Sequence, residues 1–154
     1  MTRRRIIAPV TFGHETLEAT VVAADLAAAL GAELLLVGIV PLAPPDSANG
    51  FGSTQAQGEN QRMMDQLMSE RLEELTDALP DGVRWRTVRS WGPVGPALID
   101  AAREQRADLV VVPILRESEL SHLVHDRADR YVLHHCDVPV LVVPANGDEP
   151  ARRP

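Results

Sequence analysis

The chain has 154 residues, of which 45% are hydrophobic and 24% charged, and this composition is typical of one globular domain with a core of its own. A net charge of −7 argues against a nucleic-acid partner, because affinity for nucleic acids comes largely from the neutralisation of phosphates. The chain has one cysteine, Cys136, and no apolar stretch near the ~20 residues of a membrane span, so we expect a cytoplasmic protein with no membrane partner.

The chain begins with a short apolar strand, expected over Arg5–Val10. A helix follows, and Gly31 is placed to end it. Its helical spacing is carried by four apolar residues: Leu17, Val21, Ala24 and Ala28. Residues Glu33–Val40 are predicted to form a second strand that is apolar on both faces, as a central strand of a parallel sheet is.

The segment Pro41–Gly58 has the composition of a loop, rich in Pro, Gly, Ser and Asn. A loop of this length is either a lid over a functional site or partly disordered, and we expect the latter. A long amphipathic helix is expected after it. The inner stripe of that helix consists of Met64, Met68, Leu72, Leu75 and Leu79.

The second half of the chain continues the alternation of strands and helices. Residues Val83–Ser90 alternate strictly, which predicts an edge strand with one solvated face. The next helix runs through Val94, Leu98 and Ala101. A strand over Asp108–Pro113, a helix over about Ser118–His135 and a strand over Val138–Val143 complete the pattern.

This single-pass order predicts an α/β domain over residues 1–144, followed by a polar tail over 145–154. Alternating strands and helices form a parallel sheet covered on both faces, and right-handed crossovers make it doubly wound. Ligands of such sheets bind at the carboxyl ends of the strands, where the strand order reverses. If the first strand is central, that crevice lies between Val10–Phe12 and Pro113–Arg116, with Val40 ending the neighbouring strand.

Three stretches together carry a resemblance to a known family. They are RRIIAPVTFG at the start, RSWGPVGPALIDAAREQRADLVVVP in the middle and RYVLHHCDVPVLVVP at the end. In order and spacing they resemble the universal stress protein family, from about Arg4 to Pro144. The resemblance implies a five-stranded sheet with strand order 3-2-1-4-5 and a homodimer formed through the last strand. The implied interface residues are Val138, Val140, Leu141, Val142 and Val143.

One branch of that family binds ATP through a glycine motif after the fourth strand: Gly, two residues, Gly, nine residues, Gly, then Ser or Thr. Counted back from the shared VPVLVV ending, the four motif positions fall on Pro113, Arg116, Asp126 and Arg127. An Asp that the family carries after the first strand falls on Thr11. None of the five positions matches, although the surrounding pattern is kept.

These departures oppose a phosphate site. Such a site depends on backbone N–H groups that approach the anion closely, and Pro113 has no N–H group. Arg116 adds bulk, and Asp126 adds negative charge where phosphates would lie. We therefore expect no ATP and no other cofactor. The alternative is a clamp in which Arg116 and Arg127 bind a smaller anion, although local pairing of these arginines with Glu117, Glu119 or Asp126 is the simpler interpretation.

The sequence contains no recognisable catalytic set or metal site. His122 and His125 lie three residues apart near two aspartates, but no zinc motif accompanies them. Cys136 follows His135, and adjacent helical residues do not face each other, so a structural thiol is expected. We therefore predict a non-catalytic, homodimeric stress-response protein that does not bind ATP. The alternative is a module that binds a small ligand or nucleotide in a divergent crevice containing arginine.

Overall fold

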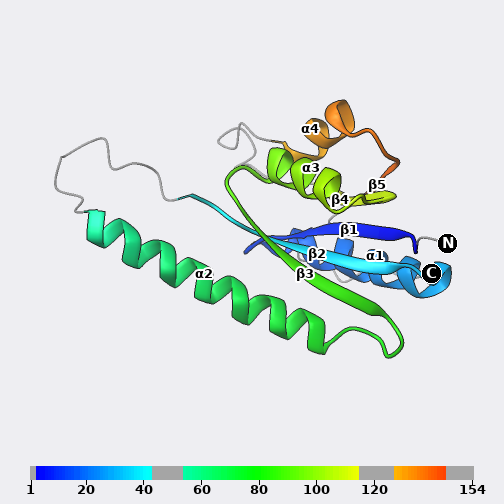
Figure 1. Cartoon of the computed structure of the whole chain (residues 1–154), viewed down its shortest axis with the longest axis horizontal. Helices are drawn as coiled ribbons and strands as arrows, with labels where there is room; N and C mark the ends of the chain where they lie inside the picture. Colours follow the sequence, from blue (N-terminus) through cyan, green and yellow to red (C-terminus); the bar gives the residue numbers. More distant parts are fainter. Residues whose placement is uncertain (1–2, 43–53, 115–126, 145–154) are drawn as a thin grey trace.

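The computed structural model describes residues 3–42, 54–114 and 127–144. Five strands form one parallel sheet in the order β3-β2-β1-β4-β5, and four helices of the described residues flank it (Figure 1). The elements in chain order are β1 (Arg5–Val10), α1 (Glu15–Leu30), β2 (Glu33–Val40), α2 (Thr54–Asp77), β3 (Arg84–Trp91), α3 (Val94–Glu104), β4 (Leu109–Ile114), α4 (Ala128–His135) and β5 (Val140–Pro144). The predicted fold class and strand order are confirmed.

The sheet separates two aliphatic cores. On one face, α1 and α2 pack against residues such as Ile6, Leu34 and Leu36. On the other face, α3 and α4 pack against Ile7 and Leu35. Successive residues of β1 and β2 thus point into opposite cores, which explains why both strands read as continuous apolar runs in the sequence.

The expected inner stripe of α1 is partly wrong. Leu17 is 36% exposed and Val21 is 57% exposed, whereas the buried side chains of α1 are small. They are Thr16, Ala19, Thr20, Ala23, Ala24 and Ala27. Small residues let the helix backbone approach the sheet closely, and Leu17, Val21 and Leu30 are left exposed, whereas Val22 and Leu26 pack at the border of the core. Gly31 ends the helix as predicted, with a left-handed φ of 62°.

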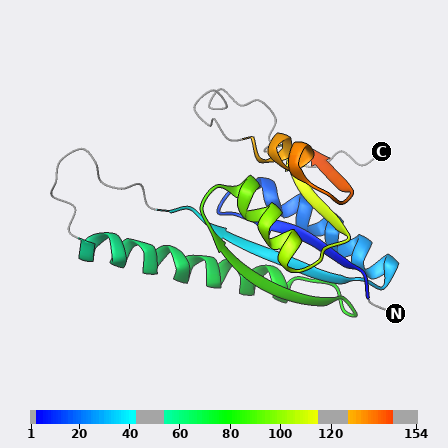
Figure 2. The same cartoon turned by 45° about the horizontal axis from the view of Figure 1, so that its top comes forward.

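Helix α2 begins at Thr54, so the expected loop up to Gly58 is wrong in its last residues, and residues 43–53 lie outside the described part. Its predicted inner stripe is confirmed, since Met68 and Leu72 are buried and the other three members pack on the same core. The first turns of α2 project beyond the sheet (Figure 2). The helix is held to β3 by hydrogen bonds from Arg89 to the Asp65 carbonyl (2.9 Å) and from the Trp91 indole to the Asp65 carboxylate (2.8 Å).

Two further expectations need correction. β3 is an edge strand, as predicted. Solvent reaches both of its faces and not only one, because all four residues Arg84–Thr87 are exposed. Helix α4 begins at Ala128, since Arg127 has extended backbone angles and serves as its N-cap. The expected helical residues 118–126 lie outside the described part of the chain. Within that part, no helix is both long and apolar enough to cross a membrane.

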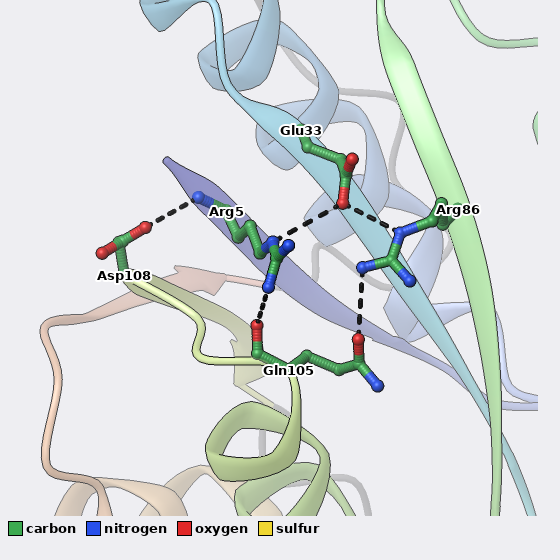
Figure 3. A network of polar contacts seen from close by, with 5 residues as sticks. All are labelled: Arg5, Glu33, Arg86, Gln105 and Asp108. Atoms are coloured by element: carbon green, nitrogen blue, oxygen red, sulfur yellow. Dashed lines mark hydrogen bonds and ion pairs between the residues drawn. The ribbon is translucent and has the colours of Figure 1, made fainter. Parts of the chain in front are cut away.

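The amino ends of the strands are tied together by a polar network (Figure 3). The Glu33 carboxylate accepts a hydrogen bond from Arg86 (2.9 Å) and lies 3.7 Å from Arg5. Arg5 also donates to the Gln105 carbonyl (2.7 Å), and its backbone N–H donates to Asp108 (2.8 Å). This network joins β1, β2, β3 and the end of α3, and it lies at the edge of the sheet opposite to the ends where ligands bind in such folds.

Candidate functional site

A cavity of about 440 Å³ lies at the carboxyl ends of β1, β2 and β4. This is the place predicted from the topology, where the strand order reverses. Its walls come from the turn after β1, the start of α3 and the start of α4. The described lining residues are Pro9, Thr11, Phe12, Gly13, Glu15, Thr16, Ile39, Pro41, Gly92, Pro93, Val94, Pro113, Ala128 and Asp129.

The turn after β1 places a carboxylate at the cavity. The Thr11 hydroxyl donates to Glu15 Oε1 at 3.0 Å and accepts the Gly13 N–H at 3.2 Å. A Cβ atom on Gly13 would fall on the Glu15 carboxylate, so that carboxylate packs against the bare Cα of the glycine. Arg71 of α2 donates to the Gly13 carbonyl (2.8 Å) and fixes the turn from outside. The half-buried Glu15 side chain is therefore held by its neighbours in a defined orientation.

The turn before α4 places a second carboxylate at the cavity. Asp129 lies in the first turn of α4, and its side chain is only 7% exposed. A guanidinium nitrogen of Arg127 donates to Asp129 Oδ2 at 3.2 Å. A buried carboxylate needs such a partner, because desolvation of an isolated charge is costly. The Arg127 guanidinium is therefore engaged with Asp129, a partner that the sequence did not predict, whereas the expected partners Glu117, Glu119 and Asp126 lie outside the described residues.

Four of the six residues predicted for the crevice lie in the described part of the chain. Thr11 and Pro113 line the cavity, as expected. Val40 does not, because its side chain points into the core under α1 and α2, and its neighbours Ile39 and Pro41 face the cavity instead. Arg127 lies beside the cavity and pairs with Asp129. Arg116 and Asp126 lie outside the described residues.

Sequence reasoning missed the two carboxylates and the wall formed by α3. Glu15 is the first residue of the helix that follows the first strand. The helix after a parallel strand begins near the carboxyl edge of the sheet, so the sequence could have predicted Glu15 beside the crevice. Gly92, Pro93 and Val94 belong to the motif WGPVGP, which follows the third strand at the same edge. The position of Asp129 at the cavity was not predicted, because the last helix was expected to begin at about Ser118 and begins at Ala128 in the structure.

The lining chemistry is apolar and acidic. Among the described residues of the wall, none is Lys, Arg or His, and the polar side chains are two threonines and two carboxylates. In the described ranges, no three His, Cys, Asp or Glu side chains are grouped so that they could hold a metal ion. The arrangement suits non-covalent binding of a small molecule with an apolar body.

The open edge of β5 carries the predicted dimer residues. In the described sheet, β5 pairs only with β4. Leu141 is 36% exposed, Val140 and Val142 are half-buried and Val143 is buried. Val138 precedes the strand and packs on the core beneath α3 and α4. Four of the five predicted residues therefore lie on the edge strand itself.

Comparison with known proteins gives the family. The model of the universal stress protein family matches residues 2–144, whereas no curated protein sequence matches the chain. Universal stress protein UspA from Lactobacillus plantarum is 19% identical, with a TM-score of 0.68 over 93% of this chain and 99% of that one. A universal stress protein in complex with cAMP is 18% identical, with a TM-score of 0.62 over 95% and 100% of the two chains. The universal stress protein from Archaeoglobus fulgidus in complex with dAMP is 14% identical, with a TM-score of 0.54 over 92% and 98% of the two chains.

At these identities, the likeness to solved structures shows a shared fold alone. The family model, in contrast, matches residues 2–144, which include nearly all the described residues. This chain therefore belongs to the universal stress protein family.

Proposed function

We propose that this chain is a non-catalytic, homodimeric stress-response protein of the cytoplasm that does not bind ATP. The observation that best supports this proposal lies at the carboxyl end of β4. Pro113 stands there at the first position of the glycine motif and lines the cavity, but it has no N–H group to offer a phosphate. Nearby, the Arg127 guanidinium pairs with the buried Asp129 carboxylate, so this guanidinium is already engaged within the protein.

The test is the thermal stability of the purified protein with and without millimolar Mg-ATP. A ligand at a hundred times its dissociation constant stabilises the folded state by about 2.7 kcal/mol, and in a domain of this size each kcal/mol raises the melting temperature by roughly 2–4 °C. A micromolar ATP site would therefore raise the midpoint by roughly 5 °C or more. We expect no measurable shift, and a shift of that size would overturn the proposal.

A variant with Pro113→Gly, Arg116→Gly, Asp126→Gly and Arg127→Ser supplies the reverse test. It restores the glycine motif and removes the carboxylate at position 126. Some recovery of ATP binding in this variant, with none in the unchanged protein, would assign the loss to these positions. The unchanged Thr11 sets a limit on that recovery.

A second function has a specific observation in its favour. The cavity at the family's crevice is open and large enough for a small molecule, and two structural relatives were solved with cAMP and with dAMP. The chain would then bind a small ligand or nucleotide through Arg116 and Arg127. Stabilisation by ATP, cAMP or dAMP that disappears in the Arg116→Ala, Arg127→Ala double variant would select this function over the first.

A further inference from the structure

We propose that the cavity at the ends of β1 and β4 binds a small organic cation: a compact apolar body that carries one ammonium group. This inference rests on the proposed function, because it assigns a use to a crevice that no longer takes ATP. It differs from the family's nucleotide site in the sign of the ligand's charge.

The walls suit an apolar body. Four prolines, Pro9, Pro41, Pro93 and Pro113, line the cavity together with Ile39 and Val94. Such side chains offer no hydrogen bonds, and burial of apolar ligand surface against them is favourable by about 25 cal/mol per Å². A volume of about 440 Å³ lies within the range of small-molecule sites. Polar recognition must therefore come from the few hydrogen-bonding groups at the rim.

The charged side chains among those groups are both acidic. The carboxylate of Asp129 is paired with Arg127 at 3.2 Å, so its charge is largely balanced within the protein. Glu15 also lines the cavity, and its carboxylate accepts a hydrogen bond from the neutral Thr11 hydroxyl. No basic side chain of the described lining offsets it. The described wall therefore carries an excess of negative charge located on Glu15.

Glu15 is also fixed in position. Thr11 holds one carboxylate oxygen, and the absence of a Cβ on Gly13 gives the carboxylate its place. Glu15 also lies in the first turn of α1, where a negative side chain is favoured, so an external anion at this place would meet a like charge. A fixed carboxylate at the edge of an apolar cavity binds an ammonium group well, because little side-chain freedom is lost on binding.

The experiment uses three probes that share one ring and differ in charge: benzylammonium, benzyl alcohol and benzoate. Binding to the full-length ¹⁵N-labelled protein is followed through amide shifts of Thr11, Gly13 and Glu15 in NMR titrations. We expect benzylammonium to bind about tenfold more tightly than benzyl alcohol, as expected for a hydrogen bond to a charged group, and benzoate to bind most weakly. Equal or tighter binding of benzoate, or no shift with any probe, overturns the inference.

A matched pair of variants locates the charge that matters. Glu15→Gln keeps an acceptor for Thr11 and removes the charge, so the preference for benzylammonium over benzyl alcohol should fall to nearly none. Glu104→Gln makes the same change at the exposed far end of α3 and should leave the preference unchanged. A preference that survives Glu15→Gln overturns the inference. The same titration of the unchanged protein with Mg-ATP separates the two proposals. ATP binding overturns the proposed function. If the unchanged protein binds no ATP and shows no preference for benzylammonium over benzyl alcohol, only this inference is overturned.

Discussion

The Thr11 hydroxyl holds the carboxylate of Glu15 at 3.0 Å. The resemblance to the family places an Asp at position 11, where this chain has Thr. In the structure a carboxylate is supplied four residues later, by Glu15 in the first turn of α1. The charge at the end of β1 is therefore kept, although it comes from a different position.

Gly13→Ala tests this arrangement. The added Cβ displaces the Glu15 carboxylate, which lies at the end of a flexible side chain, so the fold survives but the bond to Thr11 is lost. We expect the free energy of unfolding to fall by roughly 0.5–1.5 kcal/mol, the usual net value of one hydrogen bond. Urea unfolding measures the change. In a Glu15→Ala background the same substitution should cost almost nothing, and an equal cost in both backgrounds would refute the coupling.

Gly95→Ala tests the contact between α3 and α4 beside the cavity. A Cβ at this position would lie 2.8 Å from Tyr131 Cβ, close to the backbone of α4, so the two helices must separate. We expect a loss of about 1–2 kcal/mol, in the range of other overpacking substitutions. Gly58→Ala is the matched control, since its Cβ meets nothing within 4 Å on the exposed face of α2. Helix propensity predicts that the control gains up to about 1 kcal/mol, and equal effects in the two variants would rule out the steric explanation.

The fold was predictable because its signals are repeated along the chain. β2 is apolar on both faces and lies between two other strands, as its sequence indicated. The stripe of α2 was found through its period, since Met68 and Leu72 are both buried. The stripe of α1 was not found, because most positions of this helix are apolar and periodicity then selects a face poorly. Close packing by alanine decided the orientation instead.

The site was only partly predictable, for a similar reason. The topology gave the correct edge of the sheet and placed Thr11 and Pro113 in the wall. Glu15 and Asp129 depend on where two helices begin, and helix boundaries are weakly encoded in sequence. Val40 was assigned to the wrong side because side chains alternate along a strand, and a shift of one residue reverses the face.

Glu33→Gln tests the network at the amino edge of the sheet. Its carboxylate lies between Arg86 and Arg5 and is 20% exposed, so the pairs are only partly screened by solvent. We expect a loss of about 0.5–1 kcal/mol in unfolding free energy at low salt, and a smaller loss at high salt. Asp137→Asn removes the pair with Arg103, whose two side chains are 58% and 77% exposed, and should have almost no effect. A loss in the control as large as in Glu33→Gln would mean that burial does not set the strength of these pairs.

Leu141→Asp tests the proposed homodimer. An edge strand with exposed apolar residues and unpaired backbone groups favours pairing with another strand. In a two-fold symmetric dimer, the β5 strands of the two copies would pair with each other, and the backbone groups of both edges would then be hydrogen-bonded. Light scattering of the unchanged protein at micromolar concentration should give about twice the chain mass of 16.8 kDa. A carboxylate at position 141, which is 36% exposed on β5, should reduce this to the monomer mass. Leu67→Asp makes the same change at an exposed position on α2, which packs against β2, away from the β5 edge of the sheet, and should leave the dimer intact. A monomeric unchanged protein, or an equal loss of mass in both variants, would show that β5 is not the interface.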